Sequence, residues 1–238
     1  MTGVAIIPAR GGSKRIPRKN IKVFCGAPMI AHSIRAALKC PGIERVVVST
    51  DDHDIADIAR QYGAETPFIR PDALSDDFTG TIPVVAHAAQ WLKDHETLPG
   101  FVCCIYATAP FLSSEYLSRG LAQLQGNNDA DFAFSVTDYA FPIQRALKMT
   151  SNGRVEMFNP EHFSTRSQDL EEAWHDAGQF YWGRAEAWLE QRPLFSPRAC
   201  PVRLPRHRVQ DIDTPDDWVR AEWLFKAMQA EREHGESS

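Results

Sequence analysis

Continuous apolar runs alternate along the first part of the chain with segments that have helical patterning. The runs Val4–Ile7, Ile43–Thr50 and Phe101–Tyr106 predict strands that are buried within a sheet. Apolar residues recur at helical spacing over Met29–Leu38, and Asp52 is suited to cap a second helix. This alternation predicts an α/β fold with a mostly parallel sheet and helices on both faces.

The rest of the chain adds further predicted strands and one long helix. Phe132–Val136 alternates in side-chain size, His175–Trp182 ends in a run of aromatic residues, and Val209–Asp213 is predicted as the last strand. Residues 198–205 are rich in proline and arginine, so they are expected to be extended at a sheet edge. Thr214, followed by proline and two aspartates, predicts the start of the final helix.

One long stretch, about 139–174, breaks this pattern. It mixes polar and aromatic residues, contains Pro142, Gly153 and Pro160 as breakers, and has only weak strand signals near Val155. Such a stretch is too long for an ordinary connection, so it is either mobile or supported by another surface. We favour a hairpin-like arm inserted into a single domain that spans residues 1–238.

The first strand ends at Pro8 in a loop that is rich in glycine and basic residues. Gly11 and Gly12 let the backbone turn with its N–H groups directed inward, and the added positive charge favours a polyphosphate. A solvated basic turn is less favoured, because α/β sheets bind ligands at such strand ends. The loop has neither the P-loop spelling nor the dinucleotide motif Gly-x-Gly-x-x-Gly. Its basic residues are Arg10, Lys14, Arg15, Arg18 and Lys19.

Composition narrows the classes of function. The 238 residues, 43% of them hydrophobic, suffice for one large domain with an insertion. The net charge of −5 argues against general nucleic-acid binding, so the basic loop suits a small anion. Five cysteines without a Cys-x-x-Cys pair fit reduced thiols in a cytoplasmic protein. We expect no signal peptide before the first strand and no membrane span, because no apolar run approaches ~20 residues.

The basic loop resembles a known family in its spelling, from Ile7-Pro8-Ala9-Arg10-Gly11-Gly12-Ser13-Lys14 to Pro17-Arg18-Lys19-Asn20. It is similar to the opening of the acylneuraminate cytidylyltransferases, the CMP-sialic acid synthetase family. The resemblance implies a three-layer α/β/α, Rossmann-like nucleotidyltransferase fold and a homodimer joined through the arm. It also implies transfer of CMP from CTP to a nine-carbon nonulosonic sugar acid, with release of pyrophosphate.

A second group of nucleotide contacts is expected within residues 66–82. Arg70, Asp77 and Thr81 resemble the family's second motif, which would clamp the base and ribose. The alternative is a surface loop that ends in a threonine N-cap before the next helix. The resemblance assigns these residues to the nucleotide: Ala9, Arg10, Gly11, Gly12, Ser13, Lys14, Lys19, Asn20, Arg70, Asp77 and Thr81.

Two carboxylates form the candidate metal site. Asp211 and Asp213 are two apart on the last predicted strand, so they are expected on one face. Mg²⁺ commonly takes one or two carboxylates together with phosphate oxygens, and helix capping alone would need only Thr214. Catalysis is assigned to Arg10, Lys19 and Asp211. The two cations would neutralise the triphosphate and the departing pyrophosphate, and Asp211 would hold the metal.

The sugar site is inferred from the resemblance and from the polarity of one wall. Tyr106–Phe111 lacks the amide and the hydroxyl that the family usually has there, so the wall fits a sugar with more acyl and methyl surface. The aromatic residues of His175–Trp182 could instead be ordinary core. The expected sugar contacts are Tyr106, Thr108, Arg166, Gln168, Gln179 and Phe180.

Tyr106–Phe111 and His175–Trp182 also resemble the pseudaminic acid branch of the family. That resemblance favours synthesis of CMP-pseudaminic acid for surface glycan or flagellin glycosylation. Sialic acid and the eight-carbon keto sugar Kdo stay open as other substrates. A nucleotide-binding regulator without catalysis is a further alternative, although the intact basic loop and aspartate pair argue against it.

Overall fold

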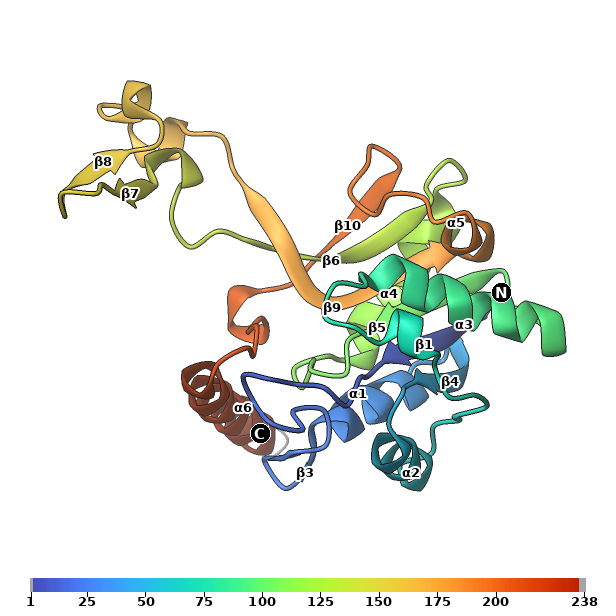
Figure 1. Cartoon of the computed structure of the whole chain (residues 1–238). Helices are drawn as coiled ribbons and strands as arrows, with labels where there is room; N and C mark the ends of the chain where they lie inside the picture. The colour runs from blue at the N-terminus through green and yellow to red at the C-terminus, as the bar shows by residue number, and fades with distance from the viewer. Residues whose placement is uncertain (1, 236–238) are drawn as a thin grey trace.

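A six-stranded sheet, in the order β10-β6-β9-β5-β1-β4, forms the centre of the molecule (Figure 1). The computed structural model describes residues 2–235, and side chains as far as residue 231. β1 (Gly3–Pro8) pairs in parallel with β4 (Ile43–Ser49) and with β5 (Phe101–Ile105). The predicted, mostly parallel sheet is therefore confirmed at this end.

The other half of the sheet contains its one reversed strand. β6 (Phe132–Asp138) pairs in parallel with the edge strand β10 (Ala199–Arg203), as expected for the segment 198–205. β9 (Trp174–Arg184) lies between β5 and β6 and is antiparallel to both. The two parallel halves of the sheet are thus joined through one antiparallel strand.

Helices cover both faces of the sheet. One face carries α1 (Met29–Leu38), α2 (His53–Gln61) and α4 (Ser114–Gly126), and the other carries α3 (Thr81–His95) and α5 (Ala185–Leu189). This arrangement is the three-layer α/β/α architecture that was predicted.

Alternate side chains of the strands enter the two cores. In β1, Ala5 and Ile7 pack in the cluster that contains α1, α2 and α4, whereas Val4 and Ile6 pack in the cluster that contains α3 and α5. All four are buried, as the continuous apolar run requires.

Helix ends follow the sequence signals only in part. The Asp52 carboxylate accepts hydrogen bonds from the backbone N–H groups of Asp54 and Ile55 at 2.9 and 3.0 Å, and Gly63, with φ of +92°, follows the end of α2. Ser113 precedes α4, but its hydroxyl makes no capping bond. Thr81 is the first residue of α3 rather than its N-cap.

The predicted strand Val209–Asp213 is wrong. A 3₁₀ turn, η5 (Arg206–Arg208), leads into irregular backbone that continues to the start of α6 (Pro215–Gly235). β10 already occupies the edge beside β6, and the N–H of Asp213 bonds to the Asp217 carboxylate at 3.2 Å instead of to a strand. The segment is fixed by the helix that follows it, not by the sheet.

A third apolar cluster joins α6 to the basic loop. Ile16 of the loop, Phe24 of the small hairpin β2 (Val23–Phe24) and β3 (Ala27–Pro28), Ile212 and Trp218 are buried together. Phe24 and Trp218 pack edge to face, with their ring centroids 5.3 Å apart. This cluster supports the loop and the segment around Ile212 from the same side.

The segment 139–174 is an arm that projects away from the sheet beyond the ends of β6 and β9 (Figure 1). Its tip is a short hairpin of β7 (Leu147–Met149) and β8 (Val155–Met157). The exposed fraction of Phe141 is 83%, and several further apolar side chains of the arm are also exposed. The remaining short turns of the chain are η1 (Asp72–Leu74), η2 (Ile143–Arg145), η3 (Pro160–His162) and η4 (Ser167–Asp169).

Two sequence-based expectations can be compared with the described residues. None of the helices in residues 2–235 combines the length and apolarity that a bilayer crossing demands. The five cysteines are free thiols, and Cys40, Cys103 and Cys104 are buried in the core.

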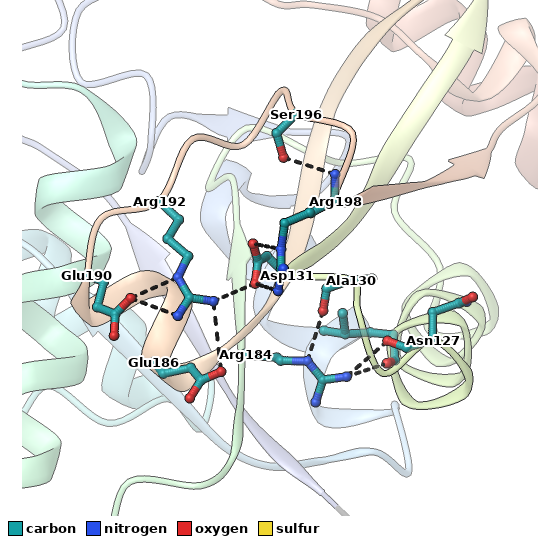
Figure 2. Close-up of polar contacts among 10 residues, drawn as sticks. Asn127, Ala130, Asp131, Arg184, Glu186, Glu190, Arg192, Ser196 and Arg198 are labelled. Carbon is teal, nitrogen blue, oxygen red and sulfur yellow. Dashed lines mark hydrogen bonds and ion pairs between the residues drawn. The ribbon is translucent and has the colours of Figure 1, made fainter.

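A buried carboxylate ties the loop after α5 to the start of β6. Asp131, 3% exposed, accepts hydrogen bonds from Arg192 at 2.6 Å and from Arg198 at 2.6 and 3.0 Å. Figure 2 shows these side chains together with Arg184, which donates to the carbonyl groups of Ala130 and Asn127 beyond the end of α4. Bonds from Arg198 and Arg192 hold the pKa of Asp131 below its usual value.

We predict that Asp131→Asn destabilises the protein by about 1–3 kcal/mol at pH 7, since charge-assisted bonds to a buried group are lost. Because the folded-state pKa is depressed, the stabilisation is complete above the unfolded-state pKa of about 3.9 and is lost as the pH falls through the folded pKa. Urea unfolding at pH 7 and pH 3 measures both effects. Asp129→Asn, at an exposed neighbouring carboxylate, is the control. Equal stability of wild type and Asp131→Asn at pH 7 would contradict the assignment.

Candidate active site

A cavity of about 330 Å³ lies beside the carboxyl ends of β1 and β5. Because these strands are parallel neighbours, the loops that follow them meet at one edge of the sheet. The N-terminus of α3 and the segment before α6 complete the wall. The predicted site residues that line the cavity are Ala9, Arg10, Ser13, Lys14, Lys19, Asn20, Arg70, Asp77, Thr81, Tyr106, Thr108 and Asp213.

Two cations of the basic loop share one carboxylate. Arg10 donates to Asp77 Oδ1 at 2.6 Å and to the backbone carbonyl of Asp76 at 2.9 Å. Lys14 bonds to the other oxygen of the same Asp77 carboxylate. The bonds from Lys14 and Arg10 lower the pKa of Asp77, so its carboxylate is ionised at neutral pH.

Lys19 is held by the segment before α6. Its ammonium donates to the carbonyl of Ile212 at 2.7 Å and to Asp213 Oδ1 at 3.2 Å. Arg15 donates to Asp213 Oδ2 at 2.7 Å. Ile212 is 1% exposed in the apolar cluster beneath the loop, so Lys19 is anchored to a well-packed segment of backbone.

The two glycines of the loop have different roles from those predicted. The Gly11 N–H donates to Asp51 Oδ1 at 3.1 Å, so it is not directed into the cavity. A side chain at Gly11 would lie 2.6 Å from the Asp52 carboxylate, which explains why this position needs glycine. Gly12 has open space around it, and neither glycine lines the cavity. The positive charge at the cavity comes from the basic side chains that line it.

Asn20 and Arg70 make hydrogen bonds that hold neighbouring parts of the cavity wall in place. Asn20 Nδ2 donates to the carbonyl of Arg10 at 2.9 Å and so fixes the start of the basic loop. Arg70, 3% exposed, donates to the carbonyl of Ser49 and to the Ser75 hydroxyl, each at 3.1 Å. Each also reaches the cavity, so both residues combine structural bonds with a surface for a ligand.

Thr81 and Tyr106 line the cavity together. Their hydroxyl groups are 2.9 Å apart and share a hydrogen bond. Burial raises the pKa of Tyr106, and the bond to Thr81 only partly offsets this effect. Tyr106 is therefore neutral at physiological pH and offers a hydrogen-bonding hydroxyl and not a charge.

The two candidate metal ligands differ in their position relative to the cavity. Asp213 lines the cavity, whereas Asp211 does not, because the irregular segment does not align them as a strand would. Partial burial and the neighbouring Asp213 carboxylate raise the pKa of Asp211, and Lys19 lowers it. Within residues 2–231 no group of three or more His, Cys, Asp or Glu is arranged to hold a metal ion. Two neighbouring carboxylates still suit Mg²⁺ when phosphate oxygens supply the other ligands.

Four predicted sugar contacts lie outside the cavity. Phe180 is fully buried in the core, so it has no surface for a ligand, and that assignment is wrong. Gln179 is also buried, and its amide donates to the carbonyl of Arg208. It therefore holds the backbone that leads to Asp211. Arg166 and Gln168 are exposed on the arm, away from the cavity of their own chain.

Several cavity residues were missed by the sequence analysis. Arg15 belongs to the basic loop, and only its ion pair with Asp213 distinguishes it from Arg18, which pairs instead with Asp52 and Asp54. Asp76, Thr79 and Gly80 lie beside Asp77 in the sequence, and this proximity was the one available signal. Ile16, Leu74 and Val84 are apolar lining residues without a local signature.

Comparisons with known proteins agree with this geometry. A pseudaminic acid cytidylyltransferase of Campylobacter jejuni is 45% identical over 226 residues, which are 95% of this chain and 97% of that protein. A CMP-N,N'-diacetyllegionaminic acid synthase of Legionella pneumophila is 32% identical over 235 residues, with the same coverage of both chains.

A solved structure shows the same fold. It is a CMP:2-keto-3-deoxy-manno-octonic acid synthetase complexed with CTP, and it superposes with a TM-score of 0.71 at 16% identity over 96% of this chain and all of that one. Residues 4–212 match the family described as cytidylyltransferase. The match covers most of the chain, and the cavity lies where the loops of parallel strands meet. The chain therefore belongs to the cytidylyltransferase family.

Proposed function

We propose that this protein joins CMP to pseudaminic acid, with CTP as the donor and pyrophosphate as the second product. The observation that carries the proposal is the convergence of Arg10, Lys14 and Lys19 on one cavity that Asp213 also lines. The choice of sugar rests on the Campylobacter jejuni relative, which this chain matches over almost its whole length. The apolar wall expected over Tyr106–Phe111 does not support that choice, because only Tyr106, Ala107 and Thr108 of this stretch line the cavity and Phe111 is buried in the apolar cluster beneath the loop.

In the proposed reaction the anomeric hydroxyl oxygen of the sugar acid attacks the α-phosphorus of CTP and gives up its proton to solvent. The bond from this phosphorus to the bridging oxygen breaks, and pyrophosphate leaves with the electron pair. Phosphoryl-type transfer needs little covalent help, so the protein aligns the reactants and neutralises charge. Arg10 and Lys19, which both line the cavity, are suited to the triphosphate, and Lys14 supports them.

Mg²⁺ is the proposed metal, held by Asp211 and Asp213 together with phosphate oxygens. When bound it would polarise the α-phosphate. The chain's own contribution is to keep Asp213 in place: Arg15 and Lys19 bond its carboxylate, and Asp217 accepts its N–H. Arg70, Thr81 and Asn20 would contact cytidine.

The arm is proposed to form a homodimer. Phe141 and other apolar arm residues are exposed, and such a surface favours a protein partner. In a dimer, Arg166 and Gln168 could reach the sugar bound by the partner chain, which a single chain does not allow. Free cysteine thiols support the cytoplasm as the location.

The choice of sugar is tested by competition between pseudaminic acid and N-acetylneuraminic acid with CTP and Mg²⁺. We expect kcat/KM for pseudaminic acid to be higher by at least about tenfold, because a site shaped for one sugar leaves polar groups unpaired when a different sugar binds. Pyrophosphate release measures both rates. Preference for N-acetylneuraminic acid would overturn the choice of sugar and leave cytidylyl transfer intact.

Lys19→Ala should lower kcat by about 10²–10³-fold, as when one preorganised charge donor is lost. Lys22→Ala is the matched control, because Lys22 lies over the Trp218 ring outside the cavity. Steady-state kinetics and thermal unfolding of both variants separate catalysis from folding. Turnover within a few-fold of wild type would remove Lys19 from the mechanism.

Replacing residues 140–172 with a short Gly-Ser turn should yield monomers. The design is feasible because Asp138 pairs with Trp174, and the Tyr139 N–H bonds to the Ala173 carbonyl at 3.1 Å, so the two ends are already adjacent. Sedimentation velocity compares the variant with wild type. A monomeric wild type would contradict the dimer.

A further inference from the structure

Asp77 bonds two of the three cations, Arg10 and Lys14, that the proposed function assigns to the triphosphate. One oxygen of its carboxylate accepts from Arg10 and the other from Lys14. All three residues line the cavity. A phosphate group recognises arginine and lysine through the same charge-assisted bonds that a carboxylate makes. Asp77 and a polyphosphate therefore require the same donors.

The loop that carries Asp77 is built as a separate unit. The Asp76 carboxylate accepts from the N–H groups of Phe78 and Thr79 at 3.0 and 2.6 Å, and from the Thr79 hydroxyl at 2.7 Å. These bonds close the loop on itself. Phe78 at its tip is 93% exposed and so adds little packing against the body. The ion pairs of Asp77 and the bond from Arg10 to the Asp76 carbonyl connect this loop to the basic loop.

Asp213 differs from Asp77 although it also pairs with two cations. It follows Ile212, which is buried in the apolar cluster, and its N–H bonds to the Asp217 carboxylate of the helix cap. Its charge also has a use in the proposed complex, as a metal ligand. Asp77 lacks this anchoring and has no metal to hold, so its negative charge opposes a bound polyphosphate, although the family resemblance places Asp77 among the nucleotide contacts.

We propose, on the basis of the proposed function, that Asp77 competes with polyphosphate for Arg10 and Lys14 and thereby weakens the binding of pyrophosphate. It leaves these cations when the β- and γ-phosphates of CTP bind. It bonds to them again as pyrophosphate departs. Asp77 thus favours release of the leaving group at a cost in affinity for CTP, and it acts by exchange of ion pairs without any covalent step.

The direct test is calorimetric binding of pyrophosphate, with Mg²⁺, to wild type and Asp77→Asn. An exposed ion pair contributes little free energy, so breaking the pairs of Asp77 opposes pyrophosphate binding only modestly. We therefore expect Asp77→Asn to bind pyrophosphate about two- to tenfold more tightly. Inhibition of turnover by added pyrophosphate should strengthen by the same factor. Asp72→Asn is the matched control: it removes one negative charge from the same region, where Asp72 is exposed and does not line the cavity. Its pyrophosphate affinity should equal that of wild type.

A double-mutant cycle with Lys14→Ala tests how Asp77→Asn increases the affinity for pyrophosphate. If Asp77 acts by occupying the cations, the gain in pyrophosphate affinity from Asp77→Asn becomes smaller when Lys14 is absent. Asp77→Ala serves as the second variant should the asparagine fail to fold. Unchanged or weaker pyrophosphate binding by the Asp77 variants would overturn the proposal and make Asp77 a residue that orients the cations.

The same measurements keep this inference separate from the proposed function. Wild type that binds neither pyrophosphate nor CTP would contradict cytidylyl transfer itself. Normal pyrophosphate binding by wild type, with no gain in either Asp77 variant, would contradict only the role of Asp77.

Discussion

The site depends on neutralising a crowded set of positive charges. Arg10, Lys14, Arg15, Arg18 and Lys19 follow one strand within a single loop, where they repel one another. Carboxylates from three separate segments pair with them: Asp77 with the first two, Asp213 with Arg15 and Lys19, and Asp52 and Asp54 with Arg18. Each pair is worth little at an exposed surface, yet the pairs of Asp77 and Asp213 hold their two segments beside one cavity, which Arg18, Asp52 and Asp54 do not line. The same cations remain strong donors for a more highly charged ligand.

Apolar packing gives this charged assembly a fixed base. Ile16 of the loop and Ile212 beside the aspartates are buried in one cluster with Phe24 and Trp218. The Lys19 ammonium bonds to the Ile212 carbonyl, so the position of this cation depends on the packing of a neighbouring apolar side chain. Helix α6 therefore contributes to the site without lining it.

The antiparallel strand β9 connects the domain to its arm. It lies between two strands of the opposite direction, and the chain enters it from the arm at Trp174. Gln179 of this strand holds the Arg208 carbonyl, which links the sheet to the segment before Asp211. The site and the arm thus share one strand as a common support.

Much of this protein was predictable from local pattern. The continuous apolar runs predicted that β1, β4 and β5 lie between two layers of helices, because a strand covered on both faces needs apolar residues almost throughout; the edge position of β4 was not predicted. The clustering of Arg10, Lys14 and Lys19 after a strand also located the cavity, since loops after parallel strands meet at one edge.

Tertiary structure decided the features that depend on distant partners. Val209–Asp213 has the local character of a strand, but β10 occupies the sheet edge, and the cap of α6 takes the backbone N–H of Asp213. An aromatic sequence such as that around Phe180 can face either a ligand or the core. Only the packing of Phe180 against α4 shows that it belongs to the core. The pairing of Asp77 with Arg10 and Lys14 joins residues more than sixty positions apart. The sequence by itself determined which residues supply charge, and the fold alone determined which charges meet, because an ion pair depends on distance in space and not on separation along the chain.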